Sequence, residues 1–258
     1  MPNTCHNCSA GTLDIPLYQP ALHAQKGDVC CTWDSVYSPI WEILGMEDND
    51  SQLFRSFNYS RATFSSLASS GVSSRVTKGR STPRPCVVLK SDRKGATLIS
   101  TICLMTTYDA TPITQMPYIF QHFSLAVFPN VSPSLRATDG HIHILPPWTN
   151  SNQWIIAYPF NSKRTEYRKE LRRWRNTHDG RDNFRLGRLA FAQLIERCEL
   201  NLASWQQLCV ADPGFNDRNK AELEVILLKS YGIGTRNTNW SAKTHERELV
   251  ERERQRVW

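Results

Sequence analysis

The segment that decides the fold reads RPCVVLKSDRKGATLISTICLMTT and covers residues 84–107. Residues 86–90 and 96–106 are rich in apolar and β-branched side chains, and the polar residues 91–95 between them are typical of a turn. Two such runs joined by a short turn predict an antiparallel hairpin. Pro85 favours an extended backbone at Arg84, so the first strand is expected to begin there.

Further β-type runs lie on both sides of this hairpin, at residues 29–33, 123–128, 141–145 and 153–158. Short strands at this spacing, separated by Pro and Gly, are typical of a small antiparallel barrel or a curled sheet. From about residue 164 the apolar residues recur at helical spacing. That spacing predicts helices over 164–175, 184–200, 218–231 and 242–257. The chain is therefore expected to be α+β, with a helical C-terminal region.

The apolar residues of these elements form the expected core. Its members are Val87, Leu89, Ile99, Ile102, Leu104, Leu125, Val127, Ile142, Ile144, Ile155, Ile156, Leu189, Leu194, Ile226 and Leu227.

Composition narrows the class of protein. The 258 residues are 40% hydrophobic, which excludes a disordered chain. No apolar run approaches the ~18 residues of a membrane span, and no basic segment followed by an apolar run opens the chain. We therefore expect no membrane contact and an intracellular location, cytoplasmic or nuclear.

The positive charge is concentrated in the C-terminal part. Residues 1–160 carry a net charge of +1, and residues 161–258 carry +6. The run KRTEYRKELRRWR at 163–175 holds seven basic and two acidic residues. On a helix, its residues Arg168, Arg172 and Arg175 share one side that could follow the phosphates of RNA or another polyanion, and Trp174 could stack on a base. The alternative is a solvated helix whose Tyr, Leu and Trp face the core.

Arg84 and Thr107 stand at the two outer ends of the predicted hairpin. Because the start of one paired strand lies beside the end of the other, these side chains are expected to face one point in space. An arginine fork can stabilise a charged phosphorane and a threonine hydroxyl can hold a phosphate oxygen, which suits RNA transesterification without a metal. The alternative is an edge arginine and a threonine in a turn.

A resemblance to a known family rests on three short pieces: Gly27-Asp28-Val29, residues 84–89 (RPCVVL), and residues 102–107. They resemble the core of the PemK/MazF ribonuclease toxins. The resemblance implies an SH3-like barrel and metal-free cleavage of single-stranded RNA. The chain differs from those toxins by an insertion between the first two strands and by its helical C-terminal region. The sequence also resembles lineage-specific proteins of filamentous fungi.

Together with this resemblance, the β-type and helical runs predict three regions. A cysteine-containing segment covers residues 1–26, and an SH3-like barrel core with an insertion at 35–80 covers residues 27–160. A basic helical region follows at 161–258.

Four N-terminal residues carry a weaker metal signal. Cys5 and Cys8 form a C-x₂-C pair, and Cys30 with His23, or with His6 in its place, could complete a tetrahedral zinc site. The alternative is free thiols in a loose N-terminus and a buried cysteine in a strand. The sequence predicts no other cofactor.

Three histidines are also candidates for chemistry. His141 and His143 alternate on a predicted strand and so share one face, which is a geometry that can bind a metal or that belongs to ordinary hydrogen-bonded strand residues. His122 is either a general base or a packed side chain.

Three function hypotheses follow. The first is an RNA-binding or RNA-cleaving barrel, which requires Arg84 and Thr107 to converge in an open basic groove. The second is a non-catalytic protein-interaction module that presents helix 242–257 to a protein partner, with the groove filled by the 35–80 insertion or by the helices. The third is a zinc-stabilised binding module. Whether the protein is an enzyme is left open by the sequence.

Overall fold

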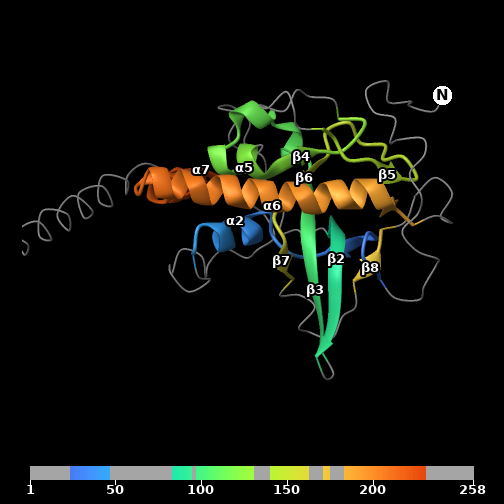
Figure 1. Cartoon of the computed structure of the whole chain (residues 1–258). Helices are drawn as coiled ribbons and strands as arrows, with labels where there is room; N and C mark the ends of the chain where they lie inside the picture. The colour runs from blue at the N-terminus through green and yellow to red at the C-terminus, as the bar shows by residue number, and fades with distance from the viewer. Residues whose placement is uncertain are drawn as a thin grey trace, which may run out of the picture.

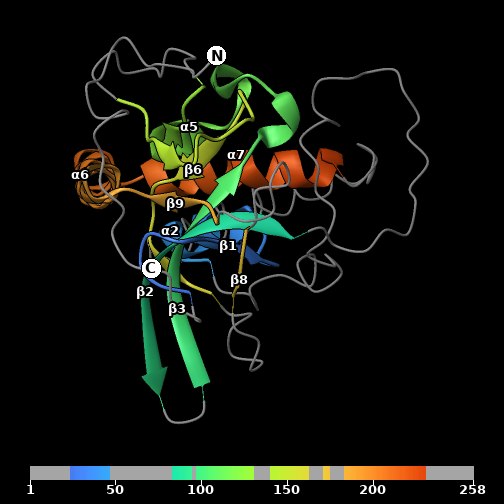
Figure 2. The same ribbon diagram turned by 90° about the vertical axis from the view of Figure 1, so that its right-hand side faces the viewer.

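The structure of the chain is a computed structural model, which describes residues 24–46, 83–94, 97–130, 140–162, 171–174 and 183–230. It contains an antiparallel sheet and helices, which confirms the α+β class. The sheet is built on the predicted hairpin of β2 (Arg84–Lys94) and β3 (Thr97–Thr106), which projects from the body of the molecule in Figures 1 and 2.

The first hairpin strand is longer than the sequence predicted, whereas the second, Thr97–Thr106, agrees with the predicted 96–106 to within one residue. β2 continues through residues 91–94, where a turn was expected, and these residues pair with β3. The hydroxyls of Ser91 and Ser100 lie 3.1 Å apart as a cross-strand hydrogen bond. Pairing along the whole strand thus overrides the turn preference of Ser and Asp. A register shift between Val88 and Lys90 marks a bulge in β2.

The remaining strands extend the sheet on both sides of the hairpin. The sheet has the order β4-β6-β3-β2-β1-β8, with β7 also beside β3. The added strands are β1 (Val29–Thr32), β4 (Ser124–Ala126), β6 (Trp154–Ile156), β7 (Phe160–Asn161) and β8 (Arg172–Arg173). A separate pair consists of β5 (Ile144–Leu145) and β9 (Arg185–Leu186). Within the described ranges, β4 and β8 are not paired with each other, so the sheet is not closed into a barrel.

The prediction of a helix over 164–175 is wrong at Arg172 and Arg173, which form the strand β8. These residues pair with Cys31 and Cys30 and so complete the outer edge of β1. The backbone groups of an edge strand require partners, and this long-range pairing outweighs the local helical spacing of the apolar residues.

Four α-helices of the described residues pack around the sheet, and two short 3-10 helices, η1 (Tyr108–Ala110) and η2 (Ile113–Gln115), follow β3. The α-helices are α2 (Tyr37–Ile43), α5 (Tyr118–Phe123), α6 (Arg188–Ala211) and α7 (Phe215–Ser230). In Figure 1 α6 crosses in front of the sheet, below α5, β4 and β6 and above α2, and Figure 2 shows it end-on at one side of these elements. No helix in the described part of the chain is long and apolar enough to cross a membrane. The predicted helix 242–257 lies outside the described residues.

The hairpin has a hydrophobic cluster on each of its faces. Cys86 and Val88 belong to one cluster with residues of α2, α5 and Trp205, whereas Val87 and Leu89 belong to the other with Leu194. Successive strand residues point to opposite faces, so the continuous apolar run of β2 fits a sheet that is covered on both sides. Helix α6 contributes to both clusters, through Leu194 near its start and Trp205 near its end.

Most of the predicted core is buried. Ile99 and Ile226 are partly exposed, and Leu227 has no described side chain. The prediction is wrong at Leu189, which is 56% exposed, because Ala190 and Leu194 define the inward side of α6.

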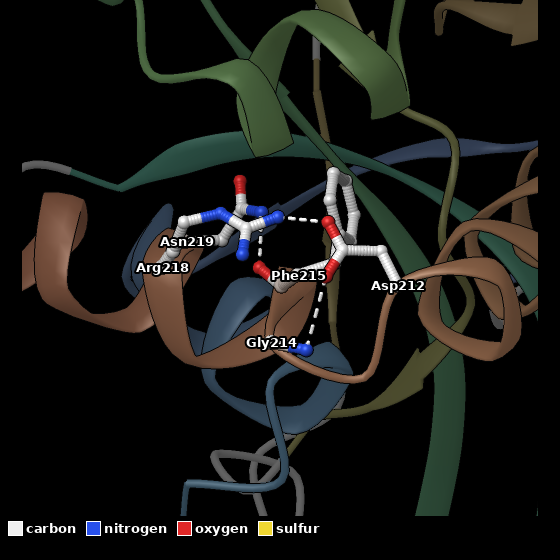
Figure 3. Close-up of polar contacts among 5 residues, drawn as sticks. All are labelled: Asp212, Gly214, Phe215, Arg218 and Asn219. Carbon is white, nitrogen blue, oxygen red and sulfur yellow. Dashed lines mark hydrogen bonds and ion pairs between the residues drawn. The ribbon is translucent and has the colours of Figure 1, made fainter.

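A polar junction separates the two C-terminal helices (Figure 3). Residues 212–214 end α6, as the sequence predicted. The Asp212 carboxylate accepts a hydrogen bond from the Gly214 backbone N–H and pairs with Arg218. The Asn219 amide donates to the carbonyl of Phe215 at 2.8 Å. The hydrogen bond from Arg218 lowers the pKa of Asp212. Helix α7 therefore begins at Phe215, three residues before the predicted start.

Candidate functional site

The structure places Arg84 and Thr107 at the same end of the hairpin. Arg84 is the first residue of β2 and pairs with Thr32 of β1, while Thr107 follows the last residue of β3. Both are partly buried. Pairing between β2 and β3 stops at Cys86 and Leu104, because β3 then pairs with β6. The two residues thus lie at the same end of the hairpin. Among the described residues, no hydrogen bond joins their side chains.

The charged group that acts on Arg84 is Asp109, two residues beyond Thr107. Burial lowers the pKa of the Arg84 guanidinium, and the nearby Asp109 carboxylate and Tyr37 phenol act in the opposite direction. Tyr37 is the first residue of α2. Asp109 is exposed. Arg84 is therefore partly buried, and the Asp109 carboxylate that acts on it is exposed to solvent.

A strained turn holds Asp109. Tyr108, Asp109 and Ala110 have φ angles of 48°, 50° and 61°, which is the left-handed region that L-residues rarely adopt. Tyr108 anchors the turn because its backbone N–H donates to the Thr106 hydroxyl and its phenol lies 2.6 Å from the Ser124 hydroxyl. Such strain persists only where the surroundings impose it, and it concentrates at functional sites.

A buried carboxylate fixes the backbone between β1 and α2. Asp34 is 5% exposed, and it accepts hydrogen bonds of 2.5 Å from the hydroxyls of Thr32 and Ser162. Thr32 is the residue opposite Arg84, and Ser162 follows β7. The network therefore links the end of β1 to the end of β7 beside Arg84. Sequence reasoning did not single out Asp34, because a lone Asp after a strand is also a common turn residue.

The predicted nucleic-acid residues divide into described and undescribed positions. Arg168 and Arg175 lie outside the described residues. Arg172 is exposed on β8, so the row of three arginines on one helix side does not form as predicted at this position. Its neighbour Arg173 donates from Nε to Asp28 at 2.8 Å, with both side chains largely buried.

Trp174 lies against the core. Its ring is 6.4 Å from that of Trp148, and it packs on the same cluster as Phe184. The Trp174 ring is partly exposed. One side of the indole thus packs on the core, as the alternative interpretation expected, although the residues before it form a strand and not the solvated helix of that alternative.

The predicted zinc set can be followed only at Cys30, since Cys5, Cys8 and His23 lie outside the described residues. Cys30 is fully buried in β1. Burial is the main cause that raises the pKa of its thiol, and the nearby Asp28 and Cys31 add to it. A zinc ligand must be a thiolate, and a bound zinc ion would itself deprotonate the thiol. All four positions of the zinc set stay a prediction.

His122 is a packed side chain, which is one of the two roles that the sequence predicts for it. The side chain is 7% exposed, its Nε2 lies 2.9 Å from the carbonyl oxygen of Asn201, and its ring contacts Trp205 edge-on at 5.3 Å.

Comparison of the chain with protein-family models, with curated proteins and with solved structures finds no match. The resemblance to the PemK/MazF toxins therefore stays a prediction. The candidate site consists of Arg84, Thr107 and Asp109, positioned by Tyr108 and Asp34.

Proposed function

We propose that the chain binds RNA and cleaves it without a metal ion, with Arg84, Thr107 and Asp109 at the reaction centre. The observation that carries this proposal is the strained turn at Tyr108–Ala110, which brings an exposed carboxylate toward a half-buried guanidinium directly after Thr107. An arginine removed from water gains more from an approaching anion than a solvated one does. The SH3-like barrel and the relation to PemK/MazF toxins are part of the same proposal.

The chemistry divides among the three side chains. The Asp109 carboxylate takes the proton of a ribose 2′-hydroxyl, and the 2′-oxygen attacks the adjacent phosphorus. Arg84 stabilises the negative charge of the phosphorane, and the Thr107 hydroxyl donates to a non-bridging oxygen. The bond from phosphorus to the 5′-oxygen then breaks, that oxygen takes a proton from water, and the hydroxide left behind takes the proton held by Asp109. The products are a 2′,3′-cyclic phosphate and a 5′-hydroxyl.

Binding would use the exposed part of the basic region. Arg172 is exposed on β8, two strands away from β2, and a contact with one phosphate at this position would not depend on base sequence. Arg168 and Arg175 are proposed to add to this contact. The partly exposed ring of Trp174 offers a surface on which a base can stack.

The test is a labelled single-stranded RNA with purified protein across a salt series. Arg84→Ala should lower the cleavage rate by about 100–1,000-fold, while most of the RNA binding remains. Arg84→Lys should restore little, because an ammonium lacks the two-pronged fork. A matched control is Lys90→Ala, which removes one positive charge from the same strand roughly 20 Å along it and should leave cleavage unchanged.

Binding and chemistry respond to different variants. Arg172→Ala should weaken binding to all sequences alike and reduce the log–log salt slope by roughly 0.7. EDTA should not change the cleavage rate. The proposal fails if the protein shows neither cleavage nor salt-dependent RNA binding at about 50 mM salt.

A second candidate function is a non-catalytic protein-interaction module. It is favoured by Tyr37 of α2, which lies within the 35–80 insertion and close to Arg84, because the second hypothesis expects this insertion to cover the site. A folded protein that binds no RNA and in which Arg84→Ala changes only stability would support this candidate.

A further inference from the structure

His141 and His143 form a close pair on the surface, remote in sequence from the Arg84 site. Their Nε2 atoms are hydrogen-bonded to each other at 3.0 Å, so one Nε2 donates and the other accepts, and both side chains are partly exposed. The intervening Ile142 and the following Ile144 are buried. The two histidines thus occupy alternate positions of an extended segment, so they share its outer face.

The backbone under the pair is held by hydrogen bonds. The N–H of Ile142 donates to the carbonyl of Ala126 at 2.8 Å, and the N–H of Phe128 donates to the carbonyl of Ile142 at 2.9 Å. Ile144 then pairs with Leu186 in the two-stranded sheet. Because both flanking residues are fixed, the distance between the two imidazoles does not depend on a flexible loop.

Phe128 fixes the rings themselves. Its ring stacks on His143 with centroids 4.8 Å apart and planes at 27°, and it lies 5.4 Å from the ring of His141. An aromatic side chain packed against two imidazoles restricts their rotation and excludes water on one side. Less conformational entropy is then lost when both nitrogens bind the same ion.

The separation of the nitrogens favours one metal geometry. Two imidazole nitrogens about 2.05 Å from one ion lie about 2.9 Å apart at a right angle and about 3.3 Å apart at the tetrahedral angle. The observed 3.0 Å is closer to the right angle. Right angles between ligands belong to the tetragonal geometry of Ni²⁺ and Cu²⁺, for which imidazole is a suitable ligand.

We propose that His141 and His143 form a two-histidine chelate for a tetragonal divalent transition metal, Ni²⁺ or Cu²⁺. Both imidazoles bind through Nε2: the ring whose Nε2 donates the hydrogen bond in the free protein moves that proton to its Nδ1, the metal ion takes the place of the hydrogen bond, and water fills the remaining positions. Water is needed there because no group of three or more His, Cys, Asp or Glu in the described residues is placed to hold a metal ion.

A buried pair of cysteines makes a useful contrast. The Cys103 and Cys198 sulfurs lie 3.7 Å apart, but the two residues are 0% and 2% exposed. Burial raises the pKa of Cys103 well above its usual value. An ion from solution does not reach these thiols without unfolding, whereas it reaches the histidine pair on the folded protein.

The experiment is a calorimetric titration of the metal-free full chain with Ni²⁺ alone at about pH 7.5, where unperturbed imidazoles are mostly neutral. We expect one site. His143→Gln and His141→Gln should each weaken its affinity at least tenfold, because one of two ligands is lost, as for lost ligand support elsewhere. The matched control is His245→Gln, which removes a histidine from outside the described residues and should leave the affinity unchanged.

Two further variants separate this site from the others. Cys5→Ser with Cys8→Ser should retain the Ni²⁺ site, and Arg84→Ala should retain it too, since the inference does not depend on the proposed RNA chemistry. Circular dichroism establishes that each variant is folded. In a Cu²⁺ titration, nitrogen hyperfine splitting from two imidazoles should appear in the electron paramagnetic resonance spectrum. Ni²⁺ binding that survives in folded His143→Gln, or that disappears with the two N-terminal cysteines, would overturn the proposal.

Discussion

Ala110 has an unfavourable backbone conformation in the strained turn, and no evident contact of its side chain within the described part of the chain compensates for it. It is exposed and has a φ angle of 61°, and a left-handed conformation costs an L-residue roughly 1–2 kcal/mol. Ala110→Gly should therefore raise the free energy of unfolding by about 0.5–1 kcal/mol, measured by urea denaturation.

The control for the Ala110→Gly substitution is Ala203→Gly, at an exposed position inside α6. That substitution should lower stability by about 1 kcal/mol, since glycine is unfavourable within a helix. If Ala110→Gly destabilised the protein by as much as Ala203→Gly, the left-handed conformation of the turn would be wrong.

Individual residues of the candidate site differ in how far the sequence predicts them. Arg84 and Thr107 follow from the hairpin, because strand ends are set by local composition and by Pro85. Asp109 and Asp34 do not follow. The role of Asp109 depends on three consecutive left-handed residues, and that of Asp34 depends on Ser162, which lies 128 residues away. Both are products of long-range packing that single-sequence periodicity does not record.

At the scale of elements, the ion pair between Arg173 and Asp28 holds β8 on β1. Their side chains are 18% and 13% exposed, so water screens the pair only in part. Arg173→Ala leaves the Asp28 carboxylate largely buried without this cation and should lower the free energy of unfolding by about 1.5–3 kcal/mol. Chemical denaturation measures this loss.

A second pair in the sheet provides the comparison. Lys90 and Asp92 are joined at 2.6 Å, but they are 68% and 47% exposed. Lys90→Ala should cost at most about 1 kcal/mol, as solvated ion pairs generally do. Equal losses for the two variants would show that β8 is not anchored by its ion pair.

The same strand shows where element prediction stops. Tyr167, Leu171 and Trp174 have helical spacing, yet residues 172–173 are a strand. The decisive interaction is the backbone pairing with Cys30 and Cys31, about 140 residues earlier in the chain. By contrast, β1, the hairpin and α6 have local signals strong enough to agree with their tertiary surroundings, and their predictions are confirmed apart from their boundaries.

At the scale of the whole molecule, α6 joins the two hydrophobic clusters. Leu194 is fully buried in one cluster, and Trp205 is 3% exposed in the other. Figure 2 shows α6 end-on beside the sheet that separates the clusters. A rigid helix that contacts both clusters couples their loss, so the described part of the chain should unfold as one cooperative unit.

This coupling gives the last prediction. Leu194→Ala should lower the free energy of unfolding by about 2–5 kcal/mol and Trp205→Ala by about 3–5 kcal/mol, although they touch different clusters. In each variant, tryptophan fluorescence and far-ultraviolet circular dichroism should report the same midpoint in urea. Leu189→Ala is the matched control on the same helix, because its side chain is 56% exposed and its loss should change stability by no more than about 0.5 kcal/mol. Two separate transitions in Leu194→Ala, one for each cluster, would mean that α6 does not unite the molecule.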